Sequence, residues 1–212
     1  MSNSNHYGYL WLAEIKFFAK KLKTTHPDLG HSQRLDYAAQ KLAKLRHYHE
    51  AITLHKKYIA SLQEDQGSGM AKCKYCGFTY CADIADDLKW HEDRHLNYEK
   101  AVKALGYKPE GFVDREDSKE KAYSAIHSAF GLDEQINAAL KVFRSHFDRS
   151  LERAIDDGYW KEHPSFDEFV AMMDYAPGVI SEKAIEVIRE KYGRKEGHIP
   201  KGGSYWFPSK QG

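Results

Sequence analysis

Two cysteines and two histidines within residues 73–95 constrain this chain more than any other feature. Cys73 and Cys76 are separated by two residues, so one tight turn can present both thiolates to the same ion. His91 and His95 are four residues apart, which places both imidazoles on one face of a helix. Two thiolates and two imidazoles suit zinc, which is usually bound tetrahedrally in such sites. The segment therefore predicts one structural Zn²⁺ held by these four side chains.

The same segment resembles the two-Cys, two-His zinc-finger family. Leu88 stands before the histidine pair at the spacing of that family's helix, and Phe78 or Tyr80 takes the place of its aromatic core residue. The resemblance implies a ββα finger with a small core of these side chains. Fourteen residues separate Cys76 from His91, where the family usually has about twelve. A longer hairpin or turn is therefore expected.

A third cysteine leaves an alternative ligand set open. Cys81 lies inside the finger segment and could replace a histidine in a three-Cys, one-His site, but its place near the end of the second expected strand suits a small buried side chain. Four protein ligands leave no open position for water or substrate, so metal catalysis is disfavoured. No nucleophile and base can be inferred elsewhere, and a binding role is therefore expected before an enzymatic one.

Composition indicates a globular protein that stays out of membranes. The chain has 212 residues, of which 42% are hydrophobic and 30% charged. Apolar runs such as residues 9–13 fall far short of a membrane span. The first six residues lack the basic and then apolar order of a secretory signal, and the odd number of cysteines argues against a disulfide framework. We therefore expect a cytoplasmic protein with no membrane partner.

The apolar spacing predicts a mainly α protein: a helical bundle with one embedded finger and a short irregular or hairpin C-terminal tail. Helices are expected at residues 8–23, 32–44, 47–63, 118–130 and 132–157, with later helices that start at Ser165 and Ser181. The predicted divisions are a basic helical segment (1–63), a polar glycine-rich linker (64–72), the finger with an extended helix (73–106) and a C-terminal helical domain (107–212).

Charge is unevenly distributed along the chain. Residues 1–63 contain ten Lys and Arg but four Asp and Glu, a net charge of +6 that leaves −5 for the remainder. This asymmetry indicates an anionic partner, most commonly nucleic acid, although a solvated basic helix face is the alternative. A helix-turn-helix arrangement of the second and third helices would direct several cations toward phosphates or base edges. The candidate nucleic-acid-binding residues are Lys41, Lys44, Arg46, Lys56 and Lys57.

Part of this basic segment also resembles a short helical module. His31–Asp36, Ala39–Leu42 and Arg46–His49 carry the resemblance, within residues 31–52. The module occurs in bacterial, plasmid and phage proteins, some of them labelled glyoxalase-related. It implies a bacterial or phage-like chain, and no activity for these residues.

The finger helix itself is expected to be acidic. Five carboxylates lie in or beside it: Asp83, Asp86, Asp87, Glu92 and Asp93. Such a cluster repels a phosphate backbone, so DNA binding by the finger is disfavoured. We therefore expect a zinc-binding protein with a structural zinc that is either a nucleic-acid-associated or a regulatory binding protein. Nucleic-acid contact would then come mainly from the segment before the finger. The alternative is a protein–protein adaptor that uses the acidic finger helix and the C-terminal helices.

Overall fold

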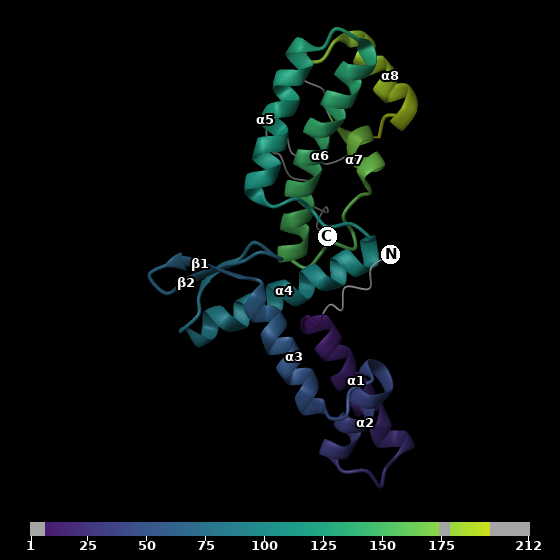
Figure 1. Ribbon diagram of the computed structural model, residues 1–212. Helices are drawn as coiled ribbons and strands as arrows, with labels where there is room; N and C mark the ends of the chain where they lie inside the picture. Colours follow the sequence, from purple (N-terminus) through teal and green to yellow (C-terminus); the bar gives the residue numbers. More distant parts are fainter. Residues whose placement is uncertain (1–6, 174–178, 196–212) are drawn as a thin grey trace, which may run out of the picture. The chain divides into compact units, whose positions relative to one another are not determined.

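The prediction of a mainly helical chain is confirmed. The computed structural model describes residues 7–173 and 179–195, and this part contains eight helices and one three-stranded antiparallel sheet (Figure 1). The chain divides into two compact units, residues 1–106 and 107–212. Unit 1 and unit 2 are described separately below. No helix among the described residues combines the length and the apolar character that a membrane crossing requires.

Unit 1 has three helices, a small sheet and a fourth, longer helix. In chain order these are α1 (Tyr9–Thr25), α2 (His31–Ala43), α3 (Tyr48–Ser61), β1 (Gln63–Gly67), β2 (Met70–Cys73), β3 (Thr79–Cys81) and α4 (Ala85–Leu105). Helix α1 packs against α2, α3 and α4. Alanines Ala38, Ala39 and Ala51 are fully buried beside Ile15 of α1, and side chains this small let the first three helices approach closely.

A real break separates α2 from α3, although the sequence has no glycine or asparagine between Leu42 and His47. Lys44 takes the left-handed conformation, with φ of 59°, and its N–H donates to the carbonyl oxygens of Ala39 and Gln40. Asp36 then accepts a 2.8 Å hydrogen bond from the N–H of Tyr48, the first residue of α3. The left-handed conformation of Lys44 ends α2, and the hydrogen bond to Asp36 fixes the start of α3. A glycine or asparagine usually marks such a helix end in a sequence.

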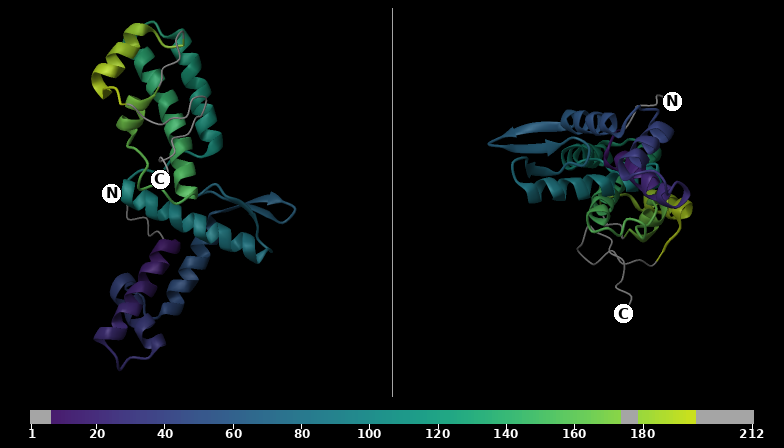
Figure 2. Two further views of the ribbon diagram at one scale, coloured as in Figure 1. Left: turned by 180° about the vertical axis from the view of Figure 1, so that it is seen from behind. Right: turned by 90° about the horizontal axis from the view of Figure 1, so that it is seen from below.

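Residues 64–72 are part of a sheet and not the linker that their composition indicates. Strand β1 pairs antiparallel with β2, and β2 pairs antiparallel with β3. All five residues of β1 are exposed, so this strand lacks the alternation of apolar and polar residues from which a strand is recognised. Gly67, Ser68 and Gly69 have positive φ values and turn the chain into β2. The sheet lies alongside α4 in the views of Figure 2.

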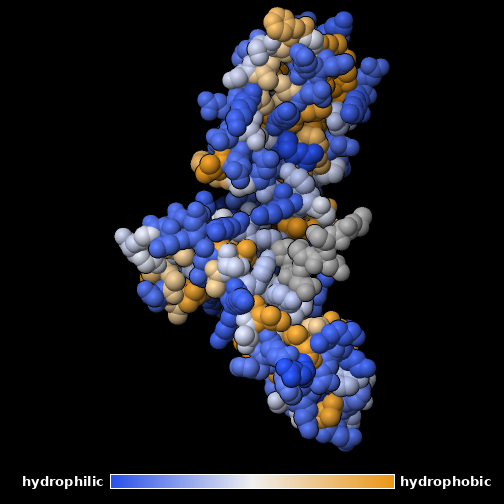
Figure 3. Space-filling view, viewed as in Figure 1, coloured by the Kyte–Doolittle hydropathy of each residue, from blue (hydrophilic) through white to orange (hydrophobic). Residues whose placement is uncertain are grey.

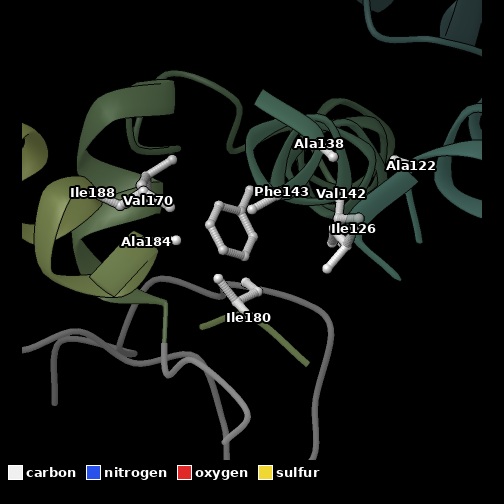
Figure 4. Packing of buried hydrophobic residues seen from close by; sticks show 10 residues of the cluster. Ala122, Ile126, Ala138, Val142, Phe143, Val170, Ile180, Ala184 and Ile188 are labelled. Atoms are coloured by element: carbon white, nitrogen blue, oxygen red, sulfur yellow. The ribbon is translucent and has the colours of Figure 1, made fainter. Parts of the chain in front are cut away.

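Unit 2 is built from four described helices around one apolar core. They are α5 (Phe112–Ser128), α6 (Leu132–Asp156), α7 (Phe166–Met172) and α8 (Glu182–Tyr192). Figure 4 shows Phe143 of α6 between Ile126 of α5 on one side and Val170 and Ala184 of α7 and α8 on the other. This core depends on α6, which contacts all three of the other helices.

The N-cap of helix α5 lies seven residues before the predicted cap at Ser118. Gly111 is the N-cap, and Arg115 lies in the first turn with a 2.7 Å ion pair to Glu152 of α6. Arg115 is only 3% exposed. This ion pair to another helix stabilises the first turn of α5. Because the partner lies far away in the sequence, the local pattern of residues does not predict the turn.

Two predicted helix starts in unit 2 are confirmed. Ser165 caps α7 and accepts from the N–H of Glu168, whose carboxylate accepts in return from the N–H of Ser165. Ser181 caps α8 and accepts from the N–H of Ala184. The predicted irregular or hairpin tail, from Gly197 onward, lies outside the described residues.

Candidate metal centre

The four predicted ligands come together in unit 1. Cys73 ends β2, Cys76 lies in the turn that follows, and His91 and His95 stand one helical turn apart on α4. Their ligand atoms all lie within 4.8 Å of one another. All four side chains are buried, none more than 2% exposed. The group could therefore hold a metal ion.

A tight turn directs both thiols to the same point. The N–H of Cys73 donates to the carbonyl of Phe78 at 2.9 Å, and the N–H of Gly77 donates back to the carbonyl of Cys73 at 2.8 Å. Gly77 has φ of +71°, a conformation that glycine adopts without steric cost. The hydrogen bonds hold Cys73 and Cys76 on one side of the turn, opposite the histidines of α4.

The two neighbouring thiols shift each other's pKa in opposite directions. A hydrogen bond from Cys76 is the main cause that lowers the pKa of Cys73, and the same bond, together with burial, raises the pKa of Cys76. Cys73 Sγ also lies 3.4 Å from Nδ1 of His95. A metal ion binds cysteines as thiolates, so metal binding at this site would release protons.

The site also contains buried nitrogen atoms that a metal or a second partner would satisfy. Nε2 of His91 and Nε2 of His95 are buried and make no hydrogen bond in the described structure. Buried polar atoms are rarely left without a hydrogen-bond partner. The donor set of two sulfurs and two imidazoles fits a soft or borderline divalent ion.

A buried glutamate stands behind the second histidine. Glu99 follows His95 by one helical turn, and its Oε1 lies 3.1 Å from Nε2 of that ring, without the alignment of a hydrogen bond. Glu99 is 9% exposed, and its other carboxylate oxygen accepts from the backbone N–H of Leu10 in the first turn of α1. A carboxylate in this position orients a histidine that binds metal through its other nitrogen. Here that other nitrogen is Nδ1, which faces Cys73.

Three tyrosines shield the imidazoles from water. Tyr75 stacks on His95 with ring centroids 4.7 Å apart, and Tyr80 stacks on His91 at 4.2 Å. Tyr9 of α1 meets the edge of the His95 ring at 5.2 Å. Burial raises the pKa values of all three tyrosine hydroxyls, so they stay protonated and add no charge to the site.

The small core around the site differs from the one that the finger resemblance implies. Tyr80 is 1% exposed, as expected, but Leu88 is 41% exposed and contributes little to the core. Its role is taken by α1, which places Tyr9 and the N–H of Leu10 against α4. Sequence reasoning missed both contacts because they depend on how α1 packs on α4. Glu99, in contrast, has a local signal, since it lies four residues after His95 on the same helix face.

The remaining cysteine lies outside the cluster. Cys81 is half-buried and is absent from the group of residues whose ligand atoms converge. Its N–H donates to the carboxylate of Asp87 at 2.9 Å, which links the end of β3 to the first turn of α4. The structure therefore favours the ligand set with two histidines.

The five candidate nucleic-acid-binding residues are all exposed, at separate positions on α2, the corner that follows it and α3. Arg46 is engaged in an ion pair with Glu50 at 3.1 Å. The ammonium group of Lys41 lies 5.5 Å from the ring centroid of Tyr37. Their exposure leaves these side chains accessible to a partner.

Comparison with known proteins adds no relative to this description. No protein-family model, no curated protein and no solved structure matches the chain significantly.

Proposed function

We propose that the chain is a zinc-binding protein whose single Zn²⁺ is structural. One observation carries the proposal: two thiols and two imidazoles converge in a fully buried cluster. Four protein ligands complete a tetrahedral site and leave no position for a substrate. In this proposal β2, β3 and α4 form a two-Cys, two-His zinc finger, and the helices of unit 2 form a separate bundle.

Metal analysis of purified protein tests the zinc assignment. We expect about one zinc per chain, because a site of four protein ligands has room for one ion. Cys76→Ser should abolish stoichiometric binding, whereas Cys81→Ser should leave it unchanged. The second variant is a matched control, since it removes a thiol from the same segment outside the cluster. Full zinc retention in Cys76→Ser would show that the metal is bound elsewhere.

We further propose that unit 1 associates with nucleic acid. The support is the net charge of +6 on residues 1–63, which a phosphate backbone would neutralise. Helix α4 is unsuited to this contact because its N-terminal half is acidic, so zinc would act by holding α4 in place against α1. Binding to DNA and RNA should therefore weaken steeply as salt rises, and no binding at low salt would refute this function.

An adaptor function has one specific observation in its favour. Ile84, Leu88 and Trp90, at and near the start of α4, are 50%, 41% and 61% exposed. Large apolar side chains at the surface are typical of protein interfaces. A pull-down with and without nuclease separates the two functions: a partner captured after nuclease treatment and lost in Trp90→Ala would support the adaptor.

A further inference from the structure

A basic hollow lies between α1 and α2, away from the candidate metal centre. It has a volume of about 620 Å³ and reaches the first residue of α3. Its walls carry Lys16, Lys20 and Lys23 from α1 and His31 and Arg34 from α2, and none of the described residues that line it is acidic. In Figure 3, hydrophilic residues predominate on the visible face of this end of unit 1.

The three lysines follow one face of α1. Their spacing of four and then three residues places them in a row. At a rise of about 1.5 Å per residue the row is about 10 Å long. All three side chains are exposed, and none forms an ion pair with a carboxylate in the described part of the chain. Charges spread over this length can contact several neighbouring phosphates at once, so the row fits a chain of phosphates.

The opposite wall supplies a cation that is already fixed in position. Arg34 is half-buried, and one of its guanidinium nitrogens donates to the carbonyl of Leu29. A guanidinium has five N–H donors, so the group keeps donors for a phosphate oxygen. An arginine held in this way loses less side-chain entropy on binding than a free one.

The first turn of α2 also favours an anion. This end of a helix carries a partial positive charge, and acidic side chains there are stabilising. Helix α2 instead begins with His31 and has no acidic residue in its first turn. Arg34 therefore places a cation near this helix start, where the helix dipole disfavours positive charge, and a bound phosphate would offset this cost.

We propose that this hollow, the α1–α2 groove, binds the phosphodiester backbone of single-stranded nucleic acid. The inference rests on the proposed nucleic-acid association and names the site and the kind of strand. Leu35 and Tyr48 provide an apolar floor beside the lysine row. A charged groove combined with an aromatic ring is typical of single-strand binding, because bases can stack on the ring.

The test compares two charge-matched variants of the full chain, loaded with zinc. Lys20→Gln/Lys23→Gln removes two charges from the groove. Lys89→Gln/Lys100→Gln removes two exposed charges from α4, outside the groove. The probe is a labelled oligothymidylate, and binding is measured by fluorescence anisotropy over a range of salt concentrations. Circular dichroism confirms that both variants are folded.

We expect the groove variant to bind about tenfold more weakly than the wild type, and the α4 variant to bind within about twofold of it. For the groove variant, the slope of log affinity against log salt should be less steep than that of the wild type by about 1.4. Two phosphate contacts are lost, and each contact to a single strand contributes about 0.7. A duplex of the same length should bind more weakly than the oligothymidylate.

Three other results would refute the groove, the choice of a single strand or the nucleic-acid function. If the wild type binds and the two variants bind equally, the groove is refuted and the nucleic-acid function stands. Binding to the duplex that equals or exceeds binding to the single strand overturns the choice of a single strand. Failure of the wild type to bind either probe at low salt refutes both the groove and the proposed function.

Discussion

Gly8→Ala should destabilise unit 1, although alanine can adopt the backbone conformation found there. A Cβ atom at this position would lie 1.6 Å from Oε1 and 2.5 Å from Cδ of Glu99. The end of a glutamate side chain usually moves aside at little cost. This carboxylate is buried and accepts from the N–H of Leu10 beside His95, so moving it breaks a contact that nothing else replaces.

Two contributions determine how much Gly8→Ala lowers the free energy of unfolding of unit 1. Loss of a hydrogen bond to a charged group costs about 1.5–3 kcal/mol. Gly8 is also the N-cap of α1, where alanine is worse than glycine by about 0.5–1 kcal/mol. We therefore expect a total cost of about 2–4 kcal/mol. In a Glu99→Ala background only the capping contribution remains, so the same substitution should cost less than about 1 kcal/mol.

A double-mutant cycle measures this coupling. Hydrogen exchange of peptides from α1 and α4 in the zinc-loaded protein reports the opening free energy of unit 1 alone. The wild type, Gly8→Ala, Glu99→Ala and the double variant form the cycle. An equal cost of Gly8→Ala in both backgrounds would refute the link between Gly8 and Glu99.

Two further predictions concern stability elsewhere in the chain. Burial raises the pKa of Asp148 to about 6 from its ordinary 3.8, although Tyr107 and the N–H of Glu110 donate to the carboxylate. Unit 2 should therefore lose up to about 3 kcal/mol as pH rises from about 4 to above 6, where Asp148 must ionise. Thermal unfolding should show this loss in the wild type and a flatter profile in Asp148→Asn; identical profiles would contradict it. Lys44→Gly should stabilise unit 1 by up to about 1 kcal/mol, because glycine takes the left-handed conformation freely, and a lower opening free energy by hydrogen exchange would contradict this.

The candidate metal centre could be predicted from the sequence because its ligands follow a local spacing pattern. A Cys-x-x-Cys turn and two histidines four residues apart specify which side chains face the same point once a turn and a helix form. The same is true of the caps at Ser165 and Ser181, where a hydroxyl and the N–H groups that it accepts from lie within one turn.

Features that depend on tertiary packing could not be predicted from the sequence. Strand β1 is polar on both faces and is held by backbone hydrogen bonds to β2, so its side chains give no strand signal. Tyr9 reaches the histidines only because α1 packs on α4. The early start of α5 depends on the ion pair of Arg115 with a residue on another helix.

The α1–α2 groove shows the same limitation for function. Sequence reasoning located the excess of basic residues in the N-terminal segment and selected Lys41, Lys44 and Arg46 among others. It could not group Lys16 and Arg34, because these residues face one hollow only after α1 and α2 pack together. Charge composition can indicate that a partner is anionic, but the fold decides which cations act together.

X-ray absorption at the zinc edge of the purified wild-type chain identifies the atoms that bind the metal. The proposed site predicts stoichiometric zinc with two sulfur neighbours at about 2.3 Å and two nitrogen neighbours at about 2.0–2.1 Å. These would come from Cys73, Cys76, His91 and His95. A spectrum with three sulfur neighbours, or one with only oxygen and nitrogen neighbours, would contradict the account.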